Sequence, residues 1–157
     1  MIFYLFWALL FVASSVCAWR ISVADFRRRI IPDAYLFPLF LMGLLTVAFF
    51  PHWFCSFQNG AMGAVLGYTL GAGVGFVFDW VGRRKDPKSD IPIGMGDIKL
   101  LATGGLWLGT NGLAIALIVA CMLGGMWGIY KKQRFIPFAP FFMIGTILAL
   151  ILMLFLV

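Results

Sequence analysis

Long apolar stretches alternate with short polar segments along the whole chain of 157 residues. Each stretch approaches the roughly 20 apolar residues that a membrane-spanning helix needs. Prolines, glycines and charged residues separate the stretches, as expected where helices end. The pattern predicts one transmembrane domain over 1–157, with six helices at about 2–25, 34–50, 61–81, 91–109, 112–130 and 137–157.

The composition supports lipid as the main solvent of these helices. Hydrophobic residues make up 63% of the chain and charged residues only 11%, whereas soluble domains carry about 25% charged residues. The mean hydropathy is +1.02. A water-soluble fold of this size has too little interior for so much apolar surface, so the sequence predicts an all-α membrane protein.

The positive charges indicate how the helices are oriented. All 12 Lys and Arg residues fall at or beside the segments after the first, third and fifth predicted helices. This is the positive-inside pattern, which predicts that these three segments are cytoplasmic and that both termini lie outside. Cys55, in the segment after the second helix, is then expected to face outward. The net charge of +6 therefore reports topology and attraction to anionic lipid rather than nucleic-acid binding.

Metal chemistry has little support in the sequence. Cys17, Cys55 and Cys121 lie far apart with no CxxC spacing, and His52 is the single histidine. This excludes a thiolate zinc site and a disulfide framework on one chain. We expect no metal and no cofactor.

Four glycines follow one another at intervals of four in the third predicted helix: Gly63, Gly67, Gly71 and Gly75. They form one bare ridge, which allows another helix to approach closely in lipid. Ordinary helix packing is the interpretation we favour. The alternative is the wall of a groove for a substrate helix.

Most of the acidic residues have simple explanations. The chain has six aspartates and no glutamate. Asp86 and Asp90 belong to a polar loop, and Asp33 is placed to cap the second helix. Asp79 is four residues before Arg83, which predicts an i, i+4 ion pair. Contact of Asp79 or Asp33 with a basic substrate stays open.

Asp25 and Asp97 are different, because they lie at membrane depth. Asp25 ends an apolar helix, and Asp97 follows Gly94-Met95-Gly96 inside the fourth predicted helix. At 1.5 Å per residue, Asp97 is about 9 Å below the cytoplasmic interface. Ionisable groups at depth are functional candidates, and the neighbouring glycines permit close approach of another backbone. The alternative is a structural ion pair with arginines near the first helix.

Two aspartates that share a site can hydrolyse a peptide without a metal. Both carboxylates cannot ionise easily, so the pair holds one proton. The ionised partner takes a proton from water, and the protonated partner donates a hydrogen bond to the scissile carbonyl. A site at the cytoplasmic boundary suits the junction between a cytoplasmic leader and an apolar segment.

Three segments carry a resemblance to the bacterial type IV prepilin peptidases, which are GxGD aspartyl proteases. Residues 94–102 (GMGDIKLLA) resemble the GxGD segment, and 105–109 (GLWLG) resemble its continuation. Asp25 followed by 29–33 (RIIPD) resembles the first aspartate and the R-x-I-P-N segment. Residues 136–141 (IPFAPF) resemble the start of the last helix. The resemblance implies catalytic Asp25 and Asp97, and active-site motif residues Gly94, Gly96, Lys99, Pro137 and Pro140.

The resemblance also implies a function and a location. Members of this family cut the basic leader from prepilins or pseudopilins of type IV pilus and secretion systems at the bacterial inner membrane. Both termini would then be periplasmic. The chain lacks the cysteine-paired insert of longer members, so it resembles a short form with peptidase activity and no methyltransferase activity. The alternatives are a non-enzymatic subunit of a pilus or secretion assembly and a small proton-coupled transporter.

Overall fold

The computed structural model describes residues 2–50, 55–85, 93–132 and 136–156. Within these ranges the chain is all-helical. The five helices are α1 (Ile2–Arg28), α2 (Asp33–Phe49), α3 (Phe57–Lys85), α4 (Met95–Lys131) and α5 (Phe138–Leu156). His52, Asp86 and Asp90 lie outside the described residues.

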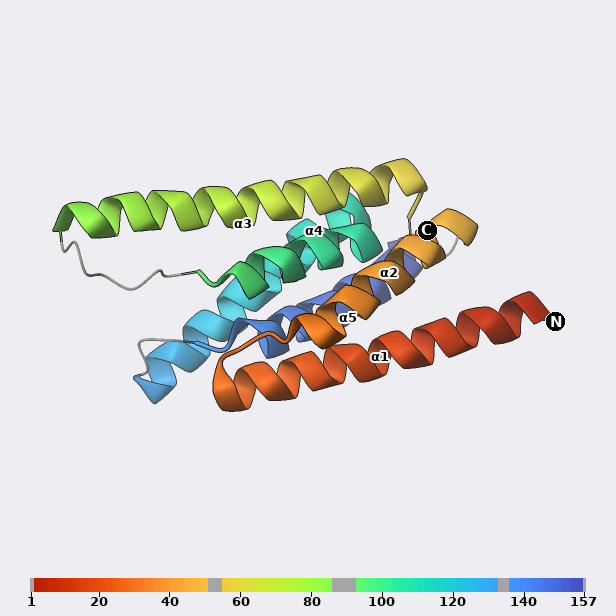
Figure 1. The fold of residues 1–157 in the computed structure, drawn as a ribbon, viewed down its shortest axis with the longest axis horizontal. Coiled ribbons are helices and arrows are strands. Elements are labelled where there is room, and N and C mark those ends of the chain that lie inside the picture. Colours follow the sequence, from red (N-terminus) through yellow and green to blue (C-terminus); the bar gives the residue numbers. More distant parts are fainter. Residues whose placement is uncertain (1, 51–54, 86–92, 133–135, 157) are drawn as a thin grey trace.

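The helices run side by side and alternate in direction, so that the molecule has two distinct ends (Figure 1). Both termini and the facing ends of α2 and α3 lie at one end. The end of α1, the end of α3 and the start of α4 lie at the other, together with the start of α5. The described residues that flank the segments predicted to be cytoplasmic therefore lie at one end of the fold.

The fourth and fifth predicted helices together form the element α4, whose backbone is interrupted between them. The expected turn between them is present as a break at Gly109, which has φ 67° and ψ −171°. A positive φ of this size favours glycine. Thr110, the next residue, donates its backbone N–H to the Asn59 side-chain oxygen at 3.1 Å, and its hydroxyl to the same atom at 2.9 Å. The chain reverses there, so that the part of α4 after Gly109 runs back beside the part before it (Figure 1).

The glycine ridge of α3 packs against the first part of α4, as the favoured interpretation predicted. A Cβ added at Gly63 would collide with backbone atoms of Gly105, and one at Gly67 with backbone atoms of Leu101. A Cβ at Gly71 would lie 3.3 Å from the Cα of Ile98. The two backbones are in direct contact, which is how helices gain attraction in lipid, where burial of apolar surface provides little.

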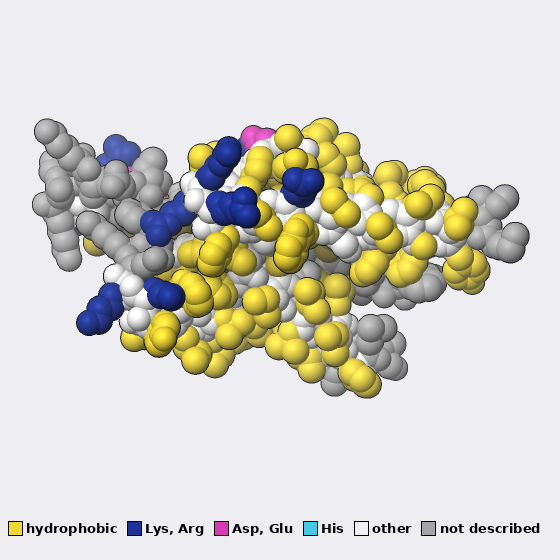
Figure 2. Space-filling model, turned by 90° about the horizontal axis from the view of Figure 1, so that it is seen from below, with side chains coloured by type: hydrophobic (Ala, Val, Ile, Leu, Met, Phe, Trp, Pro, Cys, Tyr) yellow, Lys and Arg dark blue, Asp and Glu magenta, His cyan; other side chains and the backbone are white. Residues whose placement is uncertain are grey.

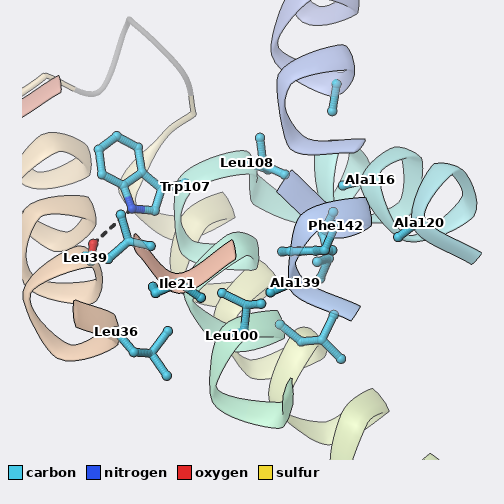
Figure 3. Packing of buried hydrophobic residues seen from close by; sticks show 13 residues of the cluster. Ile21, Leu36, Leu39, Leu100, Trp107, Leu108, Ala116, Ala120, Ala139 and Phe142 are labelled. Carbon is cyan, nitrogen blue, oxygen red and sulfur yellow. Dashed lines mark hydrogen bonds between the residues drawn. The ribbon is translucent and has the colours of Figure 1, made fainter. Parts of the chain in front are cut away.

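The second part of α4 packs against α5, and the two parts of α4 together with α1 and α2 surround the core. Figure 3 shows Leu100 and Phe142 in this core, with Ile21 of α1 nearby. Trp107 donates its indole N–H to the carbonyl oxygen of Leu39 at 3.1 Å. This bond ties α2 to α4 and satisfies the one polar atom of a buried indole.

Most of the outer surface is apolar. Three helices are long and apolar enough to cross a membrane, at Tyr4–Arg28, Phe57–Arg84 and Met95–Lys131, and two shorter helices are also apolar. On the face seen in Figure 2, hydrophobic side chains cover most of the described surface, and Lys and Arg gather toward one end. An apolar surface of this extent is expected for a protein in contact with lipid.

One finer prediction was wrong. Asp33 does not cap α2: it is the first residue of the helix, the cap position is Pro32, and no side chain bonds there. Cys55, whose outward orientation stays a prediction, has only 8% of its surface accessible, and its thiol lies 3.6 Å from the carbonyl oxygen of Leu106. In both cases the side chain has found a partner on α4 rather than a local one.

The contact between α3 and α4 makes a testable prediction about stability. Gly63→Ala should destabilise the fold by about 1–3 kcal/mol, because the added methyl group meets backbone that has no room to move. Gly73→Ala, on the same helix, is the matched control, since a Cβ there has no neighbour within 4 Å. It should be neutral or stabilising, because alanine favours helices. Unfolding in detergent micelles measures both, and equal stability of the two variants would contradict the packing.

Candidate active site

Asp25 lies in the last turns of α1, with only 5% of its surface exposed. Its Oδ2 atom accepts the backbone N–H of Ala139, the second residue of α5, at 2.8 Å. The first N–H groups of a helix have no partner within that helix. Asp25 therefore provides the acceptor that the start of α5 requires, and a carboxylate is favoured there by the helix dipole.

The two motif prolines lie on either side of this bond. Pro137 is buried just before α5, and Pro140 is the third residue of the helix. Proline has no N–H to satisfy, so it is well suited to the first turn. The segment thus starts a helix abruptly and leaves the Ala139 N–H for Asp25.

Asp97 is the third residue of α4, and it is partly buried. Its Oδ2 atom accepts the backbone N–H of Gly94, the residue that caps the helix, at 3.3 Å. In return the Asp97 N–H donates to the Gly94 carbonyl oxygen at 3.0 Å. Both aspartates therefore bind the starts of helices, Asp25 that of α5 and Asp97 that of its own helix.

Two contacts hold the start of α4 against the segment between α1 and α2. A Cβ added at Gly96 would lie 2.8 Å from the Cβ of Ile31, so only glycine fits there. A close approach was expected at this glycine, but the partner is a side chain rather than a backbone. Lys99 forms an ion pair with Asp33 at 2.8 Å. Both contacts join α4 to the residues that follow Asp25 in the chain.

Asp25 and Asp97 come together at this end of the fold although they are far apart in sequence. Their carboxyl groups are near enough to interact electrostatically. Among the described residues, however, no Cα of α1 lies within 8 Å of a Cα of α4. The two side chains therefore approach each other across a gap that is wider than ordinary helix packing. Arg29 also interacts electrostatically with Asp25.

The other acidic candidate belongs to a separate contact. Asp79 accepts a hydrogen bond from the guanidinium of Arg83 at 2.8 Å, and its side chain is 28% exposed. This confirms the predicted i, i+4 pair. Among the residues that the structure describes, no three His, Cys, Asp or Glu side chains gather as a metal site requires.

Two features of the site had not been found in the sequence. One is the Ala139 N–H, although the prolines on either side of it were a usable signal, since they leave few donors at that helix start. The other is the pairing of Lys99 with Asp33, for which the sequence offers no local signal. Charges 66 positions apart meet only once the fold is known.

Comparison with known proteins identifies the family of this chain. A model of the type IV leader peptidase family matches residues 9–129. Proteins named prepilin leader peptidase/N-methyltransferase are similar over 83% of this chain. The protein from Stutzerimonas stutzeri is 29% identical, with 45% of its length covered, and that from Escherichia coli K12 is 32% identical, with 57% covered.

The chain spans about half the length of the curated relatives that it matches. No solved structure matches it. The family match covers most of the chain and includes Asp25 and Asp97. This chain belongs to the type IV leader peptidase family.

Proposed function

We propose that this protein is a prepilin leader peptidase, an aspartic endopeptidase that removes the basic leader of a type IV prepilin or pseudopilin. Asp25 and Asp97 are its catalytic residues in this proposal. The observation that carries it is the meeting of these two carboxyl groups at one end of the fold, from helices whose backbones do not touch. The names of the relatives support the same substrate class.

The mechanism follows from the chemistry of such a pair. The bonds to Ala139 and Gly94 hold one oxygen of each aspartate, and in this proposal the carboxyl pair acts on water and substrate. One carboxylate removes a proton from water, and the oxygen of that water attacks the scissile carbonyl carbon. The protonated partner hydrogen-bonds the carbonyl oxygen, and a tetrahedral diol forms. Its collapse breaks the C–N bond as a proton passes to the leaving nitrogen.

A non-enzymatic role has one specific observation in its favour. Each aspartate accepts an N–H at a helix start, and such contacts stabilise a fold without any catalysis. Asparagine distinguishes the two roles, because its side-chain oxygen accepts the same hydrogen bond but cannot exchange a proton with water. A structural aspartate therefore tolerates replacement by asparagine, and a catalytic one does not.

The location in this proposal is the bacterial inner membrane, with the two aspartates near its cytoplasmic face. Six segments cross the membrane when the two parts of α4 on either side of Gly109 are counted separately, and both termini are periplasmic. The support is the gathering of Lys and Arg toward one end of the described surface (Figure 2) and the position of both termini at the other end. Basic residues are retained on the cytoplasmic side.

The first prediction concerns the aspartate pair. Asp25→Asn and Asp97→Asn should each lower the rate of leader removal by about 10³-fold or more, and the double variant should be little worse, since residues that act as a unit are not additive. The measurement is cleavage of a prepilin in membranes that hold equal amounts of each folded variant. Asp79→Asn is the control and should cut the same prepilin at nearly the wild-type rate. Near-normal cleavage by either single variant would sink the mechanism.

The second prediction concerns the ion pair between Lys99 and Asp33. The Asp33 side chain is 67% exposed and that of Lys99 46%, and exposed pairs contribute about 0–1 kcal/mol. Asp33→Asn should therefore lower the cleavage rate by less than about fivefold. Exchanging the two charges, in a variant with both Asp33→Lys and Lys99→Asp, should restore any loss. A 100-fold loss of cleavage rate that the charge exchange does not restore would indicate that Asp33 contacts the substrate directly.

The third prediction concerns topology. Cys55 is a poor reporter because it is buried, so the three native cysteines are first replaced by alanine. Gln58→Cys, at an exposed position near the start of α3, should then react with an impermeant thiol reagent in cells with a permeabilised outer membrane. Lys131→Cys, exposed at the opposite end, should react only after the inner membrane is opened. The reverse pattern of labelling would refute the proposed orientation.

A further inference from the structure

A cleft with a volume of about 250 Å³ lies between α1, α2, α4 and α5. Its walls are formed by α1, α4 and α5, and Leu39 contributes from α2. Since the backbones of α1 and α4 do not come within 8 Å of each other in the described residues, the space between them is left open to other side chains. Neither Asp25 nor Asp97 is itself part of the lining.

The helical faces that line the cleft on α1 and α4 nevertheless lead to the two aspartates. On α1 four of its lining residues follow one helical face at spacings of three and four: Phe11, Ser15, Ala18 and Ser22. The next position on that face is Asp25. On α4 the corresponding face begins at Asp97 and continues through Leu100, Gly104 and Trp107. Residues spaced in this way share a face of a helix. Each carboxyl group thus belongs to the same stripe as one wall of the cleft.

The chemistry of the lining is apolar, despite five hydroxyl groups. Each hydroxyl donates to a backbone carbonyl of its own helix: Ser14 and Ser15 to Phe11, Ser22 to Ala18, Thr103 to Lys99, and Thr146 to Phe142. Their protons are therefore committed within the protein. None of the described residues that line the cleft is charged. An occupant with hydrocarbon side chains fits such a lining, whereas a polar one would lose its hydrogen bonds to water.

The dimensions limit the form of the occupant. From Ser22 to Phe11 the cleft follows α1 for about 17 Å, at 1.5 Å per residue. A cleft of this length can take the side chains from one face of a helical segment that lies along it, because such side chains recur every three or four residues.

We propose that this cleft binds the apolar segment of the substrate that directly follows the scissile bond, so that it positions that bond between Asp25 and Asp97. The inference rests on the proposed peptidase function and adds to it the site that holds the mature part of the substrate. The lining residues of α1 share a helical face with Asp25, and those of α4 share one with Asp97. This relation to the two aspartates selects the substrate over a lipid chain as the occupant. About eleven helical residues of the substrate span the cleft.

The test fills the cleft from α1. Ala18→Phe places a ring in the lining, and Ala13→Phe, at an exposed position of the same helix outside it, is the matched control. Cleavage of a full-length prepilin in membranes should fall about tenfold or more for Ala18→Phe and stay within about twofold of wild type for Ala13→Phe.

A soluble peptide that ends a few residues after the scissile bond does not reach the cleft, so all three proteins should cut it alike. Equal cleavage of prepilin by both variants would overturn the proposal and leave the peptidase function intact. A wild-type protein that leaves prepilin uncut would overturn both.

A photo-crosslinking measurement covers the case in which the Ala18→Phe protein fails on both substrates. A benzophenone amino acid at Ser15, inside the cleft, should crosslink the mature part of prepilin in membranes. The same group at Val12, which is 61% exposed and outside the lining, should react with lipid alone. Reaction of the Ser15 probe with lipid alone would assign the cleft to an acyl chain and refute substrate binding there.

Discussion

The hydrogen bond from the Ala139 N–H to the Asp25 carboxylate controls the geometry of the proposed active site. Helix α1 has no backbone contact with α4 among the described residues, so its end is positioned by α2, by α5 and by this bond. An N–H left without a partner inside lipid costs several kcal/mol. Asp25 therefore stays at the start of α5, because moving away would leave the Ala139 N–H without this acceptor. Because α5 also packs on α4, the bond fixes indirectly how far Asp25 stands from Asp97.

The features that were predicted correctly from sequence are those with a local or one-dimensional signal. The glycines at intervals of four in α3 must share a face whatever the partner is, and Gly63 and Gly67 do meet the backbone of α4. Asp79 and Arg83 are neighbours on any helix. Glycine at 109 predicted a turn from composition, and its positive φ explains why the chain reverses there.

The features that were missed depend on partners that only the fold selects. Asp33 is a good capping residue in isolation, but an ion pair with Lys99 on α4 takes its side chain. Asn59 has no special place in the sequence, yet its side-chain oxygen binds Thr110 and secures the second part of α4. Cys55 lies in the loop to which it was assigned, but its side chain is buried against α4. In each case a distant segment, rather than a local rule, decided which contact the side chain makes.

The same helical geometry links the two aspartates to substrate binding. A residue at the end of a helical stripe shares its face with the residues three, four and seven positions away. Asp25 and Asp97 end the two stripes that line the cleft, so any segment held there is directed toward both carboxyl groups. One oxygen of each is already fixed by a helix start. Such preorganisation lowers the cost of orienting catalytic groups, and a contact that stabilises the fold then also serves the reaction.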